Sequence, residues 1–219
     1  MRALRVLILA NGSRPPSRFL RMLRAHTELF VATDGAANGL DADDLAPDVI
    51  LGDFDSIAPD ARTRFPAAQL VEAEDQDHSD LEKAVRYALE RGAAGVTITG
   101  ACGTRPDHTL TAFSVLAAYP EGVSDERGPV VRIAEPLWEA RAVSGSAVIA
   151  GRPGDTLSLV VFAPALIRRL EGVRWPLRDE TLVPGSRGVS NVMTGTEAWL
   201  EVASGVVIAC LLQPELARQ

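Results

Sequence analysis

The stretch Pro47 to Ser56, P-D-V-I-L-G-D-F-D-S, places two acidic residues directly after a short apolar run. Val49 to Leu51 is apolar throughout, which is typical of a buried strand in a parallel sheet. Asp53 and Asp55 follow Gly52, and in extended backbone residues two apart point to the same face. Open α/β sheets bind their ligands at the carboxyl ends of their strands. The stretch therefore predicts a parallel α/β sheet with a site beside Asp53 and Asp55.

Two carboxylates that point to one place repel each other unless a cation lies between them. Mg²⁺ is the usual cation where phosphates are near. The alternative interpretation is a polar turn, because Gly, Asp and Ser are common loop residues. Further stretches that can reach the same edge of the sheet favour the site.

Other expected strands also end in candidate ligand residues. Leu29 to Ala32 is followed by Asp34, and Gly95 to Thr99 by a glycine-rich turn that leads to Arg105. Arg105 can pair with phosphate oxygens through its planar guanidinium group, whereas Asp34 can equally serve as a helix cap. Gly12 follows the first expected strand, where it either lets a phosphate approach the backbone or closes a strand-to-helix turn.

The clearest expected helix begins at Ser79 to Glu82, which matches the S-x-x-E capping box, and apolar residues then recur at helical spacing. Asp80 and Lys83 lie three residues apart on it, so both side chains can lean toward one side. Each can be a solvated surface charge, or the two can meet a metal ion and a phosphate. Near Asp53 and Asp55 we favour the second interpretation.

Composition narrows the class of protein. The chain has 219 residues, 47% of them hydrophobic, and a net charge of −7. The acidic balance argues against nucleic acid or an anionic membrane as a partner. Cys102 and Cys210 lack the spacing of a zinc site or a disulfide scaffold. The apolar run near the N-terminus is too short for a signal peptide, and no stretch reaches the length that spans a bilayer, so we expect a cytoplasmic protein.

The alternation of strands and helices stops near Tyr119, where a polar, turn-rich segment at residues 121–129 follows. We place a domain boundary there, with an α/β domain at residues 1–128 and a second domain at residues 129–219. The second domain carries short β-like runs separated by turns, which predicts a β sandwich or roll. Trp175 within it can belong to the core, and Ser190-Asn191 can be only a turn.

Several blocks of the chain resemble the thiamine pyrophosphokinase (thiamine diphosphokinase) family, in the family's order. They are D-G-A-A-N at Asp34, P-D-V-I-L-G-D-F-D-S-I at Pro47, D-Q-D-H-S-D-L-E-K at Asp75, G-A-C-G-T-R-P-D-H at Gly100, G-V-R-W-P-L at Gly172 and G-V-S-N at Gly188. The chain departs from the family's pattern at Ala36, Thr104 and Ala112. These departures bear on fine geometry and rate more than on the assignment.

The resemblance implies an N-terminal Rossmann-like parallel sheet with flanking helices and a C-terminal all-β sandwich that binds thiamine. It also implies a homodimer with the active site in the cleft between subunits. The reaction would move the diphosphoryl group of ATP to the hydroxyl of thiamine, giving thiamine diphosphate and AMP.

The resemblance also assigns residues to roles in that reaction. Asp53, Asp55 and Asp80 would hold Mg²⁺ and, with Arg105, would be the catalytic residues. ATP and its phosphates would lie among Asp34, Asn38, Gln76, Lys83, Arg105 and Asp107. Trp175, Ser190 and Asn191 would bind thiamine.

Competing interpretations differ in class. One is a related diphosphokinase that acts on another hydroxymethyl heterocycle such as a pterin, against which the blocks around Trp175 and Ser190-Asn191 speak. Another is a non-catalytic sensor that binds thiamine or a nucleotide, which would need no reactive cluster of acids with Arg105. A doubly wound hydrolase is a weaker option, since the chain has neither a G-x-S-x-G nor a Walker A pattern.

Overall fold

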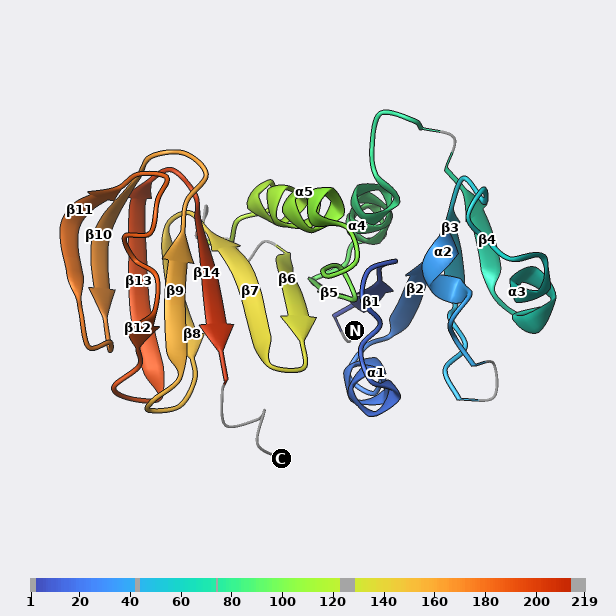
Figure 1. Cartoon of the computed structure of the whole chain (residues 1–219), viewed down its shortest axis with the longest axis horizontal. Helices are drawn as coiled ribbons and strands as arrows, with labels where there is room; N and C mark the ends of the chain where they lie inside the picture. The colour runs from blue at the N-terminus through green and yellow to red at the C-terminus, as the bar shows by residue number, and fades with distance from the viewer. Residues whose placement is uncertain (1–2, 42–43, 74, 123–128, 214–219) are drawn as a thin grey trace. The chain divides into compact units, whose positions relative to one another are not determined.

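The structure is a computed structural model that describes residues 3–41, 44–73, 75–122 and 129–213 (Figure 1). The chain divides into two compact units, Met1–Ala112 and Phe113–Gln219, and the division falls within one helix. The expected boundary after residue 128 stays a prediction, because residues 123–128 lie outside the described residues. None of the helices in the described part of the chain is long and apolar enough to cross a bilayer.

The first unit contains a parallel sheet in the order β5-β1-β2-β3-β4, in which each strand pairs in parallel with its neighbours in this order. Its strands are β1 (Arg5–Leu9), β2 (Leu29–Thr33), β3 (Val49–Gly52), β4 (Gln69–Glu72) and β5 (Gly95–Thr99). Its helices are α1 (Ser17–Arg24), α2 (Asp34–Ala37), α3 (Pro59–Arg64), α4 (Asp80–Glu90) and α5 (Pro106–Ala117), the last of which continues into the second unit. The predicted parallel α/β sheet is confirmed.

Local sequence explains two of the helices that cover this sheet, α1 and α4, which Figure 1 shows below and above the strands. α4 begins where the Ser79 hydroxyl accepts a hydrogen bond from the Glu82 N–H at 3.3 Å, as in the predicted capping box. Its buried stripe includes Ala84, Val85 and Ala88, and the helix packs against β1, β2 and β3. α1 buries Leu20 and Leu23 and exposes Arg18 and Arg21, the pattern of an amphipathic surface helix.

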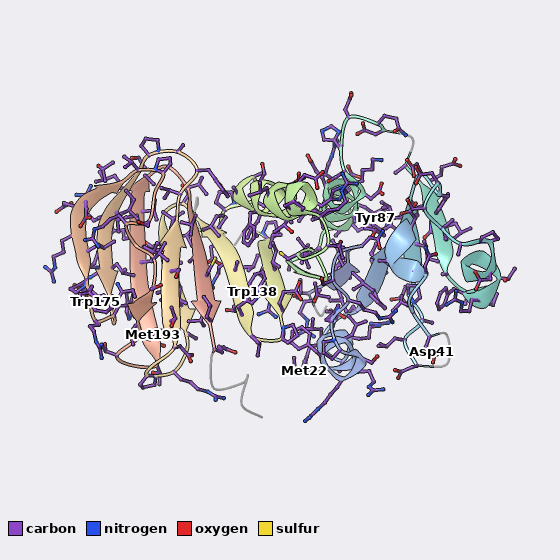
Figure 2. The ribbon with its side chains drawn as sticks, viewed as in Figure 1. Met22, Asp41, Tyr87, Trp138, Trp175 and Met193 are labelled. Carbon is purple, nitrogen blue, oxygen red and sulfur yellow. The ribbon has the colours of Figure 1, made fainter. Side chains whose placement is uncertain are left out.

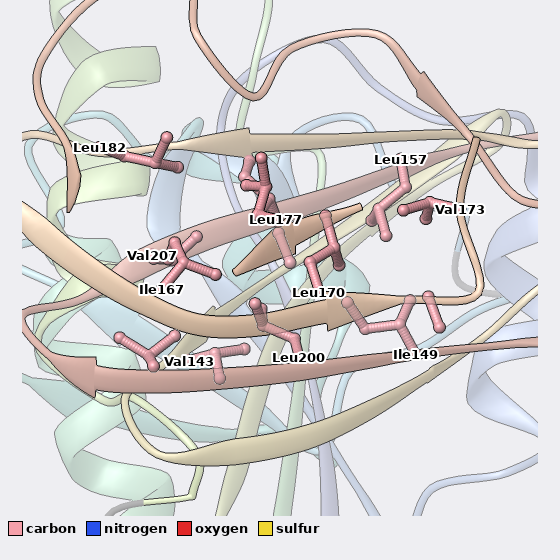
Figure 3. Packing of buried hydrophobic residues seen from close by; sticks show 14 of the residues in the cluster. Val143, Ile149, Leu157, Ile167, Leu170, Val173, Leu177, Leu182, Leu200 and Val207 are labelled. Carbon is pink, nitrogen blue, oxygen red and sulfur yellow. The ribbon is translucent and has the colours of Figure 1, made fainter. Parts of the chain in front are cut away.

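The second unit is a sandwich of two antiparallel sheets, in the orders β12-β9-β14-β7-β6 and β11-β10-β13-β8. Its strands are β6 (Val130–Glu135), β7 (Trp138–Val143), β8 (Ser146–Ala150), β9 (Thr156–Val160), β10 (Ala165–Glu171), β11 (Leu177–Leu182), β12 (Asn191–Val192), β13 (Glu197–Ser204) and β14 (Val207–Leu212). Leu157 and Val207 of one sheet and Leu170 and Leu200 of the other belong to one buried cluster (Figure 3). The predicted β sandwich is confirmed.

Candidate active site

Three aspartates converge at the carboxyl edge of the parallel sheet. Asp34 follows β2, Asp53 follows β3, and Asp80 lies in the first turn of α4. One carboxylate oxygen from each lies within 4.8 Å of the others. β2 and β3 are neighbours in the sheet, which brings Asp34 to the same edge as Asp53. Three carboxylates this close repel one another, so the group has the oxygen ligands and the negative charge that suit a hard divalent cation.

Asp34 is the buried member of the group, with 2% of its surface exposed. Its carboxylate accepts hydrogen bonds from the Gly35 and Ser56 backbone N–H groups. Burial raises the pKa of Asp34 above its ordinary value, and repulsion from Asp80 and Asp53 adds to the rise. A negative charge at Asp34 is therefore costly without a cation, and a bound cation would remove that cost.

The surroundings of Asp53 lower its pKa, whereas those of Asp34 raise the pKa of Asp34. The Asp55 N–H donates to its carboxylate at 3.2 Å, and this bond is the main reason why the pKa of Asp53 lies below its ordinary value. A hydrogen bond from the Gln76 side chain and the positive charge of Lys83 lower it further. Asp53 is thus held ionised and ready to bind a cation.

Asp55 does not belong to the acidic group that the described residues form. The expectation that Asp53 and Asp55 point to one face assumes extended backbone, but β3 ends at Gly52 and Phe54 has a φ of 62°. This left-handed turn directs the chain away from the strand. Asp55 is exposed and accepts a hydrogen bond from the Ser56 hydroxyl at 2.7 Å. It contacts Asp53 instead of sharing a ligand position with it.

The two predicted cations differ in setting. Lys83 has a buried side chain, and its ammonium group donates to the Ala73 carbonyl at 3.2 Å and to Asp80 Oδ1 at 3.3 Å. Arg105 is exposed and forms a two-point pair with Asp107, with Nη2–Oδ2 at 2.6 Å and Nε–Oδ1 at 3.1 Å. This pair lowers the pKa of Asp107 to about 2. Lys83 is therefore a fixed charge beside the acids, whereas Arg105 is oriented by Asp107.

A cleft of about 300 Å³ lies over the acidic group, a volume in the range of small-molecule sites. It lies wholly within the first unit. Among the residues that line it are the predicted Gly12, Asp34, Asp53, Gln76, Asp80, Lys83 and Arg105. Asn38, Asp55 and Asp107 are not among the described residues that line it.

Gly12 and Asn38 both hold loops at the rim of the sheet. The Gly12 N–H donates to the Gly100 carbonyl at 2.7 Å, and a Cβ at Gly12 would lie 2.5 Å from that oxygen. Of its two interpretations, the structure therefore favours close packing of the turns. The Asn38 side chain donates to the Ser56 carbonyl at 2.8 Å and accepts from the Ala58 N–H at 2.7 Å, which fixes the loop after Asp55.

The predicted thiamine residues lie in the second unit, where Trp175 is labelled in Figure 2 on the segment between β10 and β11. Trp175 is 51% exposed, so it is not a core residue. The Arg174 guanidinium lies 5.5 Å from the centre of its ring. Asn191 is buried and grips the backbone of Trp175: Oδ1 accepts from its N–H at 3.0 Å and Nδ2 donates to its carbonyl at 2.7 Å.

Ser190 precedes Asn191 with a φ of 63°. Its N–H donates to the Ser158 hydroxyl at 2.9 Å, and the residue itself is exposed. Ser190 and Trp175 thus present surface to a ligand, whereas Asn191 positions the backbone that carries the tryptophan.

Sequence reasoning passed over several residues that line the cleft, notably Thr33, Ser56 and His78. The His78 ring lies 2.6 Å from Asp75 Oδ2, and this pair belongs to the loop that precedes α4. Thr33 stands at the end of β2, directly before Asp34, where the rule for the carboxyl ends of parallel strands could have found it.

Two family models match the chain. One, described as "Thiamin pyrophosphokinase, catalytic domain", matches residues 20–124, and the other, described as "Thiamin pyrophosphokinase, vitamin B1 binding domain", matches residues 148–207. The first contains the acidic group and the cleft residues from Thr33 onward. The second contains Trp175, Ser190 and Asn191.

Curated relatives of the chain carry the same family name as these models. The chain is 32% identical over 138 residues to "Thiamine pyrophosphokinase 3" of Oryza sativa subsp. japonica, covering 52% of this chain and 51% of the relative. It is 34% identical over 117 residues to "Thiamine pyrophosphokinase" of Bacillus subtilis (strain 168), covering 50% and 52%. The chain thus spans about half the length of the curated relatives it matches.

Solved structures match over nearly the whole chain. The crystal structure of thiamine pyrophosphokinase from Bacillus subtilis has a TM-score of 0.79 at 23% identity, covering 95% of this chain and 99% of that one. Thiamin pyrophosphokinase from Candida albicans has a TM-score of 0.79 at 19% identity, covering 96% and 90%. At these identities the match shows that the fold is shared.

Proposed function

We propose that this chain, which belongs to the thiamine pyrophosphokinase family, transfers the diphosphoryl group of ATP to the hydroxyl of thiamine, giving thiamine diphosphate and AMP. The observation that carries the proposal is the convergence of Asp34, Asp53 and Asp80 in a cleft that also holds Lys83 and Arg105. Carboxylates that can bind a cation, beside two positive side chains, are the groups that a metal–polyphosphate complex needs.

We propose that Asp34, Asp53 and Asp80 hold the expected Mg²⁺. The fit of these residues to the ion rests on their oxygen ligands and on the buried charge of Asp34, whose pKa is raised by burial and by its two acidic neighbours. Asp55, expected from the family resemblance to be a ligand, takes a positioning role in this proposal, since it hydrogen-bonds Asp53. When bound, the ion would neutralise charge on the phosphate oxygens.

The chain's own residues would then act by position and charge. In the proposed reaction, the thiamine hydroxyl attacks the β-phosphorus of ATP and gives up its proton to a carboxylate of the acidic group. The bond from that phosphorus to the bridging oxygen of the α-phosphate breaks, and AMP leaves with that oxygen. The fixed ammonium group of Lys83 and the guanidinium group of Arg105 would stabilise negative charge that develops on the transferred oxygens. Asp107 would keep Arg105 oriented for this role.

On the thiamine side, the exposed ring of Trp175 would contact the cationic, aromatic substrate. Such a cation–π contact contributes about 1–2 kcal/mol when it is shielded from water. The Arg174 guanidinium lies over the same ring, so thiamine would use the other ring face or displace Arg174. The match to the vitamin B1 binding model over this region supports thiamine instead of a pterin as the acceptor.

The test measures the products formed from ATP and Mg²⁺, with and without thiamine. The proposal expects AMP and thiamine diphosphate in equal amounts, formed only when thiamine is present. ADP as the product would mean transfer of one phosphoryl group and would reject the proposal. A hydroxymethyl pterin in a parallel reaction tests the alternative acceptor, and AMP formed with the pterin alone would replace thiamine as the substrate.

We also propose that the protein works as a homodimer in the cytoplasm, with the active site completed at the subunit cleft, as the family resemblance implies. Mixing two impaired variants, assayed at a thiamine concentration well below the KM of Trp175→Ala, tests the shared site. Asp53→Asn and Trp175→Ala change residues of different units of the chain, so unfolding and refolding them together would restore part of the activity in mixed dimers. Light scattering on the unmixed protein gives the oligomeric state, and a monomer with full activity would contradict the proposal.

A further inference from the structure

Thr33 carries a buried hydroxyl group that has no hydrogen-bond partner in the part of the chain that the structure describes. It is the last residue of β2, 3% of its surface is exposed, and it lines the cleft beside Asp34. Among the described residues, no hydrogen-bond partner is present for its Oγ1 atom. Because folding removes such a group from water, an unpaired hydroxyl costs free energy that a hydrogen bond would have offset.

The ordinary structural explanation for a threonine at this position does not apply. Thr33 is the N-cap residue of α2, and threonine at an N-cap usually accepts a hydrogen bond from a backbone N–H of the first turn. Here the side chain makes no such bond. Thr99, at the end of β5, offers a contrast, because it is equally buried, has an interaction partner and is not among the described residues that line the cleft.

A change of side-chain rotamer is the movement that would present the Thr33 hydroxyl to a ligand. Oγ1 itself is shielded from solvent in the unliganded chain, although the residue lines the cleft. Rotation by about 120° about the Cα–Cβ bond moves the hydroxyl to another of the staggered positions. The position of Thr33 next to Asp34, one of the acids proposed to hold Mg²⁺, places this hydroxyl beside the polyphosphate of a bound nucleotide.

We propose that the Thr33 hydroxyl donates a hydrogen bond to a phosphate oxygen of the nucleotide bound in the cleft, an inference that rests on the proposed function. Phosphate oxygens accept hydrogen bonds and donate none at neutral pH, which suits a hydroxyl that has a proton to donate. Thr33 would then help to bind the polyphosphate, and its hydroxyl would lack a partner only while no nucleotide is bound. Binding satisfies the hydroxyl that folding leaves unpaired.

The test compares Thr33→Val, which replaces the hydroxyl with a methyl group of similar size, with Thr33→Ser, which keeps the hydroxyl. Thr99→Val is the matched control, because it makes the same change at the end of β5 in the same sheet, outside the lining of the cleft. Calorimetry measures the Kd of each protein for Mg²⁺–ATP, Mg²⁺–inorganic triphosphate and adenosine. The melting temperature of each unliganded protein reports whether the fold is kept.

The proposal expects Thr33→Val to weaken binding of Mg²⁺–ATP and of triphosphate by about tenfold. Adenosine binding stays unchanged, and the unliganded variant melts at the wild-type temperature or above it. Thr33→Ser and Thr99→Val keep affinities within about threefold of wild type, a margin within the spread of such contacts.

Other outcomes overturn the proposal. The Thr33 hydroxyl would not bind phosphate if Thr33→Val bound triphosphate as tightly as wild type or lost as much affinity for adenosine. A clear fall in the melting temperature of this variant would instead give the hydroxyl a structural role. A wild-type chain that binds Mg²⁺–ATP tightly but releases no AMP with thiamine would reject the proposed function and leave the Thr33 contact standing. Normal AMP release by the wild-type chain, together with unchanged binding by Thr33→Val, would support the proposed function and reject the Thr33 contact.

Discussion

The carboxylate of Asp34 lies directly over the Cα atom of Gly52, the last residue of β3. A Cβ atom at Gly52 would stand 2.8 Å from Asp34 Cγ and 2.9 Å from its Cβ, closer than such atoms approach in folded proteins. Because Gly52 has no side chain, the buried Asp34 that follows β2 can lie against the end of β3. A side chain at position 52 would displace Asp34 from the acidic group.

Replacing Gly52 by alanine should therefore displace Asp34. We expect Gly52→Ala to cost about 1–3 kcal/mol in stability, as overpacking does, and to weaken Mg²⁺ binding. The measurement is the rise in melting temperature on adding Mg²⁺, which should shrink in the variant. Gly195→Ala is the control, because a Cβ there meets nothing within 4 Å. A full Mg²⁺-dependent rise in Gly52→Ala would show that Asp34 is not needed for the metal.

The raised pKa of Asp34 leads to a prediction about stability and pH in metal-free protein. A carboxyl whose folded pKa exceeds its ordinary value of 3.8 favours folding when protonated, and this contribution is lost as pH rises through the folded pKa. Asp34→Asn carries no charge at any pH and avoids that loss. We expect its melting temperature to exceed that of wild type by about 2–4 °C at pH 7, with a smaller difference near pH 4.

Chelator in the buffer keeps this comparison free of metal. Adding Mg²⁺ should then reverse the order of the two proteins, because the ion stabilises wild type and finds one ligand fewer in Asp34→Asn. If the variant were less stable than wild type at pH 7 without metal, the hydrogen bonds from Gly35 and Ser56 would outweigh the cost of the buried charge.

Asp53 and Asp55 should differ in their contributions to activity. Asp53 lies in the acidic group and lines the cleft, so we expect Asp53→Asn to abolish turnover while the protein keeps its fold. Asp55→Asn keeps the backbone N–H that donates to Asp53, and its side chain is exposed. We expect it to retain activity within about tenfold of wild type, as for loss of one supporting hydrogen bond. Equal losses in the two variants would restore Asp55 as a metal ligand.

Local sequence patterns predicted the elements that local interactions define. The apolar run at Val49 to Leu51 gave β3, and the capping box at Ser79 gave α4. The sequence pattern does not reveal β10, because Arg168 and Arg169 interrupt its alternation near a bulge in the pairing with β13. It does not reveal β11, because only the two end residues of that strand are apolar. Such strands are stabilised by pairing with strands that are distant in sequence, so a short stretch of sequence does not contain the signal for them.

The candidate site was predictable at its strand ends and not in its exact membership. Asp34 could be placed after a strand, but its position beside Asp53 depends on β2 pairing with β3, a fact of strand order. Asp55 was predicted to share the face of Asp53 because nothing in the sequence announces a left-handed residue at Phe54, a residue type that rarely takes that conformation. Tertiary arrangement therefore decides that Asp34 is grouped with Asp53 and Asp80 among the described residues.

Trp175 gives the prediction that tests the second unit. Its ring is half exposed while Asn191 fixes its backbone, an arrangement that presents a flat apolar face without burying it in the core. We expect Trp175→Ala to raise the KM for thiamine by about tenfold or more, as loss of a 1–2 kcal/mol stacking contact implies. The KM for ATP and the melting temperature should change little. Steady-state kinetics with each substrate varied in turn measures both constants.

Trp199 supplies the matched control for that measurement. It is 49% exposed in β13 of the same unit, lies opposite Val148 of β8, and belongs to none of the blocks assigned to thiamine. Trp199→Ala therefore removes a similar ring at a similar exposure and should leave both KM values unchanged. If both variants raised the thiamine KM alike, the effect would come from a general loosening of the sandwich. If only the ATP constant moved in Trp175→Ala, the ring would belong to the nucleotide side of the reaction.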